Sequence, residues 1–232
     1  MSKLPDNSID LIVTDPPYYN QGTCPTYKYG NRKKVVTDQG EWDHFENEGE
    51  YLKFMRRVIK ELCRVLKKNG SLYIFISDRY ISYIRAYLRA EPNMSYASSI
   101  VWAKTNAPPR LIYKAGFISS KEMFCFAYKG DNPVFHKPKL FKELLDVWFY
   151  PQTPKGERVG HPTQKPLSII QKIVKCSSNP GDLVLDCFFG SGTVAVACRM
   201  LGRNFIGLEI SPEYCQIARK RLSAISNIDC WI

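Results

Sequence analysis

The chain has 232 residues, of which 44% are hydrophobic and 13% aromatic. This length suits a single domain with a substantial core, and the composition excludes an intrinsically disordered chain. The formal net charge of +11 indicates either a basic soluble surface or a polyanionic partner, most often nucleic acid.

The cysteines and the hydropathy of the chain indicate in which compartment the protein is expected. None of the eight cysteines forms a C-x-x-C pair and only three histidines occur, so the sequence predicts neither a metal site nor a disulfide framework. We therefore expect a reducing, cytoplasmic compartment. The polar N-terminus predicts no signal peptide, and no apolar run approaches the roughly 18 residues that span a membrane.

Strand and helix patterns alternate along the chain. Apolar and β-branched runs predict strands at 9–14, 71–77, 98–104, 122–129, 183–186 and 205–208. Apolar residues at helical spacing predict helices at 50–67, 79–89, 168–176, 193–201 and 212–223, and Asn69-Gly70 is expected to end the first. Most strand runs are continuously apolar, as in strands covered on both faces. The expected fold is α/β around a mostly parallel sheet.

Two segments interrupt this alternation. Residues 19–49 contain YKYGNRKK at 27–34, and residues 130–163 contain HKPKLFK at 136–142. We interpret both as long loops, which in a compact domain are often functional. Their basic and aromatic residues suit a nucleic-acid surface, although a solvated loop explains them equally well.

A glycine turn in DCFFGSGT, residues 186–193, separates a predicted strand from a predicted helix. Gly190 and Gly192 allow close approach of a ligand to the backbone at a helix N-terminus. The following strand ends at Glu209, which suits a ribose. The spacing also fits a dinucleotide site, so an NAD(P)-dependent oxidoreductase is an alternative. Asp186 argues against it, because a carboxylate there repels a pyrophosphate but suits the amine-bearing S-adenosylmethionine.

The stretch LIVTDPPYYN, residues 11–20, contains the end of a predicted strand followed by a turn with two consecutive prolines, which we call the corner. Pro16 and Pro17 each fix φ and lack an N–H group, so the corner offers carbonyl acceptors without donors. Asp15 adds a carboxylate and Tyr18 a flat ring. This combination favours a planar heterocycle that bears an amino group, with the ring stacked on it. The simpler alternative is a turn that ends a strand.

Four motifs together resemble the amino-directed DNA methyltransferases. They are DPPY at 15–18, HPTQKP at 161–166, DCFFGSGT at 186–193 and GLEISPEY at 207–214. Their order resembles the circularly permuted β class. The resemblance implies a Rossmann-like class I methyltransferase sheet with one antiparallel strand. It also implies a single catalytic domain over 1–232, in which loop insertions at about 19–49 and 130–160 are expected to recognise the target.

The resemblance assigns roles to matching residues. Asp15 and the Pro16 carbonyl would bind the target amine, and Tyr18 would stack on the base; the motif also includes Pro17. The residues expected to bind S-adenosylmethionine are Asp186, Phe188, Gly190, Ser191, Gly192, Thr193, Glu209, Thr163, Gln164 and Lys165. Among them, Lys165 is expected to pair with the cofactor carboxylate, and the HPTQKP segment is also expected to cap the next helix. The residues expected to contact DNA are Lys28, Arg32, Lys33, Lys34, Arg110, Lys137 and Lys139.

The implied function is site-specific methylation of adenine N6 in double-stranded DNA by base flipping. Cytosine N4 is the alternative target, and a non-catalytic nucleic-acid-binding module is a more distant one. A homodimer and a cognate restriction endonuclease are left open as partners. Relatives usually carry an acid-bearing strand upstream of the first strand seen here, and we expect residues 227–232, with Asp229, to supply it.

Overall fold

The computed structural model describes residues 1–19, 44–107, 117 and 119–225. Within them, seven strands form one sheet in the order β5-β3-β4-β2-β1-β6-β7. The strands are β1 (Ile9–Thr14), β2 (Leu66–Ile76), β3 (Met94–Lys104), β4 (Lys121–Lys129), β5 (Val147–Tyr150), β6 (Leu183–Asp186) and β7 (Asn204–Gly207). Only β4 runs antiparallel to its neighbours β2 and β3. The mostly parallel α/β sheet with one antiparallel strand is thus confirmed.

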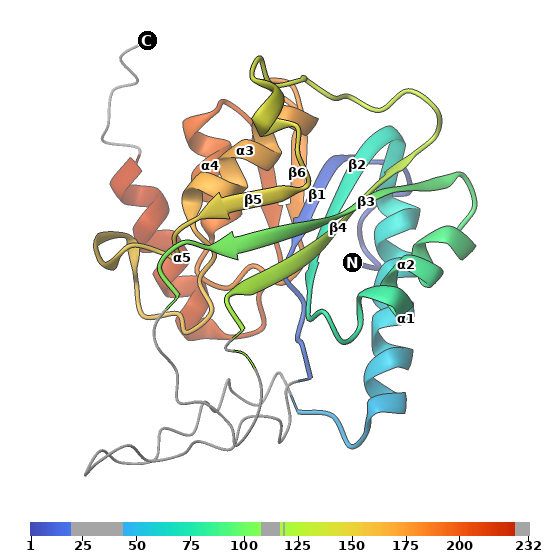
Figure 1. Cartoon of the computed structure of the whole chain (residues 1–232), viewed down its shortest axis with the longest axis horizontal. Coiled ribbons are helices and arrows are strands. Elements are labelled where there is room, and N and C mark those ends of the chain that lie inside the picture. The colour runs from blue at the N-terminus through green and yellow to red at the C-terminus, as the bar shows by residue number, and fades with distance from the viewer. Residues whose placement is uncertain (20–43, 108–116, 118, 226–232) are drawn as a thin grey trace.

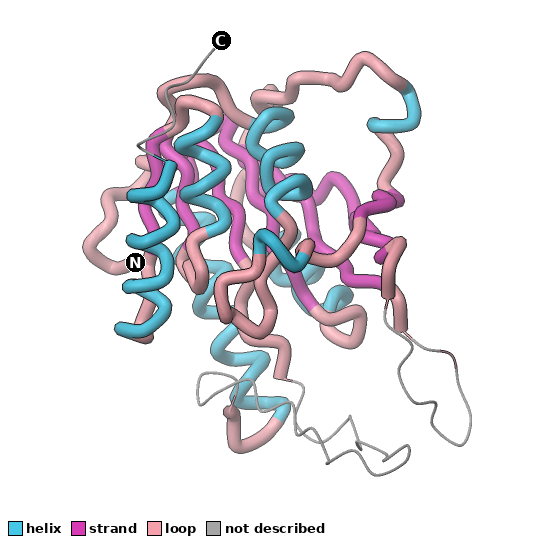
Figure 2. Tube along the Cα trace, turned by 90° about the vertical axis from the view of Figure 1, so that its left-hand side faces the viewer, coloured by secondary structure: helices cyan, strands magenta, loops and turns pink. Residues whose placement is uncertain are grey.

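Helices cover both faces of this sheet (Figure 1). They are α1 (Glu48–Val65), α2 (Ile81–Ala90), α3 (Leu167–Ser177), α4 (Thr193–Met200) and α5 (Pro212–Ile225). One buried cluster joins α1 and α2 to the sheet, and the other joins α3 and α4. Figure 2 looks onto the second face, where α5 packs against α4. Because both faces are covered, the central strands are apolar throughout.

Helix α1 ends two residues before the predicted end at residue 67, and Asn69-Gly70 does not form its C-terminus. Its last residue is Val65, and β2 begins at once with Leu66. Asn69 has a φ of +66°, and the pairing with β1 shifts register around it. A Cβ on Gly70 would lie 2.8 Å from the Asp10 carbonyl oxygen. Asn69-Gly70 therefore forms an irregularity within a strand, where small and left-handed residues are needed.

The expected loop at 130–160 is partly wrong, because it contains a strand and two 3-10 turns. Strand β5 pairs in parallel with the end of β3 and extends the sheet by one edge strand. Its Trp148 is buried against α3, while Phe149 is 71% exposed. A run of four residues is too short to show a clear period in the sequence. The 3-10 turns are η2 (Phe141–Glu143) and η3 (Lys155–Glu157).

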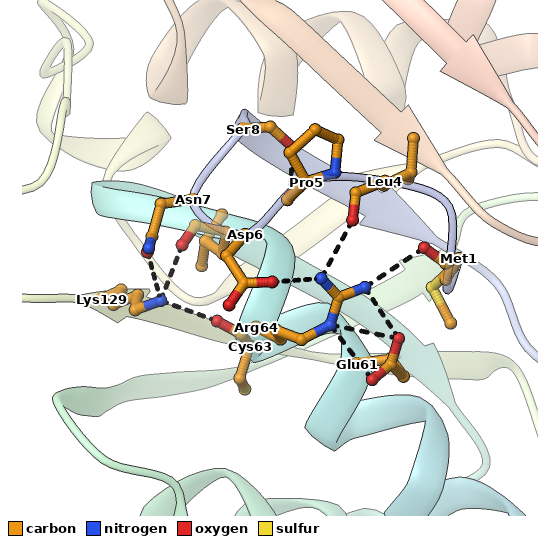
Figure 3. Close-up of polar contacts among 11 residues, drawn as sticks. Met1, Leu4, Pro5, Asp6, Asn7, Ser8, Glu61, Cys63, Arg64 and Lys129 are labelled. Carbon is orange, nitrogen blue, oxygen red and sulfur yellow. Dashed lines mark hydrogen bonds and ion pairs between the residues drawn. The ribbon is translucent and has the colours of Figure 1, made fainter.

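The first eight residues pack against the start of β2 and the end of α1 (Figure 3). Arg64 of α1 donates to the Leu4 carbonyl oxygen at 3.0 Å and pairs with Asp6. Lys129 of β4 donates to Asn7 and to main-chain carbonyls at 2.8–2.9 Å. Among the described residues, none pairs with the outer edge of β7. The segment 227–232 expected to do so lies outside the described residues.

The chain direction brings the ends of several strands to one edge of the sheet. The parallel strands β1, β2, β6 and β7 all end there, and the antiparallel β4 begins there. We call this the carboxyl edge. The segment after β4 lies at the opposite edge, where the amide of Val134 bonds to Asn69 and that of His136 to Cys176. No described helix is long and apolar enough to cross a membrane.

Candidate active site

The corner after β1 holds Asp15 at the carboxyl edge. The Pro17 carbonyl accepts a hydrogen bond of 3.0 Å from the Tyr51 hydroxyl of α1. The Pro16 carbonyl accepts no hydrogen bond from the residues that the structure describes. Tyr19 has a φ of +49°, and its ring stacks on Tyr51 at a centroid distance of 5.5 Å. The corner is thus anchored on one side and leaves one carbonyl acceptor available.

Asp15 is held by two donors. The Tyr18 hydroxyl donates to its Oδ1 at 2.7 Å, and the Lys165 ammonium pairs with its Oδ2. Burial raises the pKa of Asp15 above its usual value, although the Lys165 charge opposes this. Burial disfavours the charge of Lys165, but Asp15 and Glu122 together raise its pKa. The structure therefore places Lys165 on Asp15, whereas the sequence predicts it at the cofactor carboxylate.

Glu122 is a neighbour that sequence reasoning missed. It stands near the start of β4 and pairs with Lys104 at 2.7 Å and with Lys165 at 3.3 Å. Burial opposes its ionisation, but the two lysines outweigh burial and lower its pKa. An acid at the start of an otherwise apolar strand is a signal that could have identified it. Its position at the site requires β4 to be antiparallel, which the sequence pattern does not reveal.

Asp186 ends β6 beside the Asp15 corner. It accepts hydrogen bonds from the Thr14 hydroxyl at 2.9 Å and from the Phe188 amide at 3.1 Å. Among the described residues it has no cationic partner, and its side chain is buried. Burial raises the pKa of Asp186 to about 7, against the effect of these hydrogen bonds. A buried carboxyl in this state would ionise readily beside a cationic ligand.

The glycine turn adopts left-handed backbone angles, with φ of +49° at Gly190 and +75° at Gly192. A Cβ on Gly190 would lie 2.9 Å from the His161 ring, and one on Gly192 would lie 2.9 Å from Ala218. Both positions therefore require glycine. The Gly190 amide donates to Glu209 at 2.6 Å, so the acid after β7 meets the turn after β6, as their parallel order dictates.

Arg221 of α5 supports the same turn and was missed by sequence reasoning. It donates to the Ser191 carbonyl at 2.8 Å, to the Ser191 hydroxyl at 3.2 Å and to the Thr193 hydroxyl at 3.1 Å. Gly207 provides room for Phe189, whose ring carbons lie 2.3–2.6 Å from the place of a Gly207 Cβ. These contacts depend on how α5 and β7 pack, and no local pattern predicts them.

The HPTQKP segment is held by the turn before it. The Gln164 side chain accepts from the Val159 amide at 3.1 Å and donates to the Glu157 carbonyl at 2.9 Å. The Glu157 carboxylate accepts from the Leu167 amide at 2.8 Å. Pro166, the last residue of HPTQKP, is the N-cap residue of α3, as expected, but the side-chain bond to the first turn comes from Glu157. Thr163 donates its amide to the His161 ring at 3.3 Å.

One cleft at the carboxyl edge joins most of these residues. The predicted residues that line it are Asp15, Thr163, Gln164, Lys165, Asp186, Phe188, Gly190, Ser191 and Thr193. The predicted residues Pro16, Pro17, Tyr18, Gly192 and Glu209 adjoin this lining in sequence or by the contacts above. His161 and Phe189 also line the cleft, and the sequence did not single them out. Burial lowers the pKa of His161 to about 4, so its ring is neutral at pH 7.

The predicted DNA contacts divide into two groups. Lys28, Arg32, Lys33, Lys34 and Arg110 lie outside the described residues. Lys137 and Lys139 are exposed, but they follow the antiparallel β4 and lie at the opposite edge from Asp15. The structure therefore does not bring these two lysines to the cleft. Among the described residues, no group of His, Cys, Asp and Glu is placed to hold a metal ion.

Comparison with known proteins adds independent findings. A family model described as DNA methylase matches residues 9–220. The chain is 37% identical over 234 residues to the Type II methyltransferase M2.DpnII of Streptococcus pneumoniae, covering 97% of this chain and 86% of that protein. It is 33% identical to the Type II methyltransferase M2.MboI of Moraxella bovis, with coverage of 98% and 85%.

Solved structures show the same likeness. The crystal structure of an M1.HpyAVI–SAM complex superposes with a TM-score of 0.71 at 33% identity, covering 95% of this chain and 90% of that one. The PvuII DNA methyltransferase, described as cytosine-N4-specific, also has a TM-score of 0.71, covering 100% of this chain and 83% of that one. At 19% identity, the second likeness shows the fold alone.

Proposed function

The chain belongs to the DNA methylase family, and we propose that within it the protein methylates the N6 amine of adenine in duplex DNA. Membership makes it an S-adenosylmethionine-dependent amino-methyltransferase and removes the oxidoreductase alternative. The choice of adenine rests on Asp15, because in the family that the motifs resemble an aspartate at the head of DPPY is commoner for adenine N6 and a serine for cytosine N4. Asp15, whose side chain is 22% exposed, lines the same cleft as the glycine turn.

The residues of the cleft fit S-adenosylmethionine. Asp186 is a buried carboxyl without a cationic partner among the described residues, which suits the ammonium and sulfonium groups of that molecule. The glycine turn presents bare backbone at the N-terminus of α4, and Glu209 lies beside it for the ribose. When bound, the cofactor supplies an electrophilic methyl group. Phe188, Ser191, Thr193, Thr163 and Gln164 would complete its surroundings.

Asp15 and the Pro16 carbonyl would bind the two hydrogens of the target amine. The lone pair of such an amine is delocalised into the ring, so the nitrogen is a poor nucleophile. Two acceptors on its hydrogens favour a tetrahedral nitrogen with a localised lone pair. When the nitrogen gains a methyl group it must release one proton, and Asp15, whose pKa burial raises, is a suitable acceptor. Positioning of amine and methyl can supply on the order of 7–11 kcal/mol of the rate enhancement.

Tyr18 would stack on the extruded base. Its hydroxyl holds Asp15 at 2.7 Å, so the ring stands next to the acceptor for the amine. Stacking of a base on an aromatic ring contributes roughly 1–3 kcal/mol. A base within a duplex cannot reach Asp15, because the carboxylate is in a cleft, so the target must be flipped out.

The wider setting is proposed on the same basis. We take residues 1–232 as one catalytic domain that acts in the cytoplasm, where bacterial DNA lies. The relatives M2.DpnII and M2.MboI are named Type II methyltransferases, which supports a place in a restriction–modification system with a cognate endonuclease. A homodimer is a further proposal, and light scattering of the purified protein tests it.

Product analysis tests the target directly. Purified protein is incubated with labelled S-adenosylmethionine and unmethylated duplex DNA, and the DNA is digested to nucleosides for mass analysis. We expect N6-methyldeoxyadenosine. N4-methyldeoxycytidine would overturn the choice of adenine, and unlabelled DNA would overturn the proposal as a whole.

Asp15→Ala separates chemistry from cofactor binding. Loss of one well-placed polar group in a transition state costs about 2.7–4 kcal/mol, so turnover should fall at least 100-fold while S-adenosylmethionine still binds. Asp78→Ala is the matched control, because Asp78 follows β2 at the same edge, is 55% exposed and does not line the cleft. Unchanged turnover in Asp15→Ala would refute the assigned role.

A further inference from the structure

Glu122 is a partly buried acid for which the proposed mechanism has no use. Its side chain is 22% exposed, and its Oε2 atom is buried without a hydrogen bond among the described residues. That oxygen lies 3.3 Å from the Lys165 ammonium, which is hydrogen-bonded to Asp15 instead. One lysine thus forms ion pairs with two carboxylates and donates a hydrogen bond to only one of them, Asp15.

The charges of this group are balanced. Two lysines, Lys104 and Lys165, face two carboxylates, Asp15 and Glu122. Lys165 is only 7% exposed, so water cannot easily replace a lost partner. The ammonium can therefore leave one carboxylate only if the other receives it.

Asp15 needs such a release in order to bind the target amine. Its Oδ1 already accepts from the Tyr18 hydroxyl, and its Oδ2 pairs with Lys165. An ammonium bound to the carboxylate competes with the weaker N–H donor of the amine for the same oxygen. The Oε2 atom of Glu122 accepts no hydrogen bond from the described residues and already pairs with the ammonium at 3.3 Å, so it can accept the lysine after a small movement.

We propose that Glu122 is a positioning residue that receives Lys165 when the target amine enters, and so frees Asp15 to accept it. This inference rests on the proposed function, because it assumes that Asp15 binds the amine. Glu122 acts through Lys165 and does not touch the base. Lys104 keeps Glu122 ionised and in place from its other side, at 2.7 Å.

The test compares Glu122→Gln with wild type on two readouts. The first is single-turnover methylation at saturating cofactor and DNA. The second needs no turnover: binding of duplexes that carry adenine or unsubstituted purine at the target position, with S-adenosylhomocysteine present. The affinity ratio of the two duplexes reports how well the site binds the amino group. In Glu122→Gln we expect methylation to fall about 10- to 100-fold and the ratio to approach one, because Lys165 stays on Asp15. Glu122→Asp should restore part of both.

Lys121→Met is the matched control, because Lys121 precedes Glu122 on β4, pairs with the exposed Asp78 and does not line the cleft. It should retain near-wild-type values in both readouts. If Glu122→Gln does not fold, Lys104→Met combined with Glu122→Gln keeps the charges balanced and still lacks the second carboxylate. That double variant should show the same losses.

Three outcomes would overturn the inference. Glu122→Gln, or the double variant, could keep wild-type methylation and discrimination. Lys121→Met could reproduce the losses, which would mean that they come from disturbing the start of β4. Asp15→Ala distinguishes a failure of the proposed function from a failure of the role assigned to Glu122. If Asp15→Ala keeps the preference for the amino group, the proposed function fails; if it loses the preference while Glu122→Gln keeps it, only the role of Glu122 fails.

Discussion

The Thr14 hydroxyl donates a hydrogen bond of 2.9 Å to the Asp186 carboxylate, and both side chains are buried. This bond joins the ends of β1 and β6, two adjacent parallel strands, although its two residues lie 172 positions apart in sequence. It connects the half of the cleft that holds Asp15 to the half that holds the glycine turn. The ionisation of Asp186 should therefore affect cofactor affinity, and the Thr14 hydroxyl of the neighbouring strand should affect the pKa of Asp186.

Cofactor affinity should depend on pH through Asp186. Its pKa is raised to about 7, so below pH 7 the carboxyl is protonated and offers no charge to a cationic ligand. The apparent affinity for the cofactor should then fall about tenfold per pH unit below 7 and level off above it, because it follows the ionised fraction of Asp186. Calorimetric titration of S-adenosylmethionine between pH 5.5 and 8.5 measures this.

Asp186→Asn is the control for that profile. It should weaken binding at pH 8 and remove the pH dependence that wild type shows beyond the titration of the cofactor itself. His161 has its pKa lowered to about 4 and does not titrate in this range. Parallel profiles for wild type and Asp186→Asn would contradict the assignment.

Thr14→Val should shift the same profile upward. The hydroxyl stabilises the ionised carboxylate, so its loss raises the pKa of Asp186 further and moves the binding midpoint above pH 7. Valine has nearly the shape of threonine, and the lost hydrogen bond should lower the free energy of unfolding by about 1 kcal/mol. A midpoint that does not move, or moves to lower pH, would mean that the bond does not control this carboxyl.

Gly207→Ala should destabilise the cofactor side of the cleft. The new Cβ would lie 2.3 Å from the Phe189 ring, which stacks on Phe205. Overpacking of this kind costs about 1–3 kcal/mol, or several degrees in melting temperature. Gly156→Ala is the control, because nothing lies within 4 Å of its Cβ position. Equal melting temperatures in the two variants would contradict the packing described here.

Arg221→Met should loosen the glycine turn without touching Asp15. It removes three hydrogen bonds to Ser191 and Thr193, so cofactor affinity should fall about tenfold, the equivalent of one net hydrogen bond to a charged group. Turnover at saturating cofactor should change little. Arg219→Met on the exposed side of the same helix is the control and should bind normally. A loss of turnover with unchanged affinity would point to a different role.

The elements predicted best are those with a strong local pattern. The bounds of β1 and β6 agree with prediction at both ends, because each is a short apolar run between clear breakers. The glycine turn was equally visible, since Gly190 and Gly192 adopt left-handed angles that other residues avoid. Strand β5 was missed because it is short and lies at the edge of the sheet, with alternate residues exposed.

The sequence by itself determined the motifs, the fold class and the residues that end the parallel strands, because all of these follow from local spacing and backbone preference. Only the tertiary structure decided which side chains meet. The antiparallel direction of β4 brings Glu122 to the cleft and takes Lys137 away from it. The packing of α5 brings Arg221 to the glycine turn. Lys165 rests on Asp15 because burial requires the nearest opposite charge, and nearness across 150 residues is a property of the fold alone.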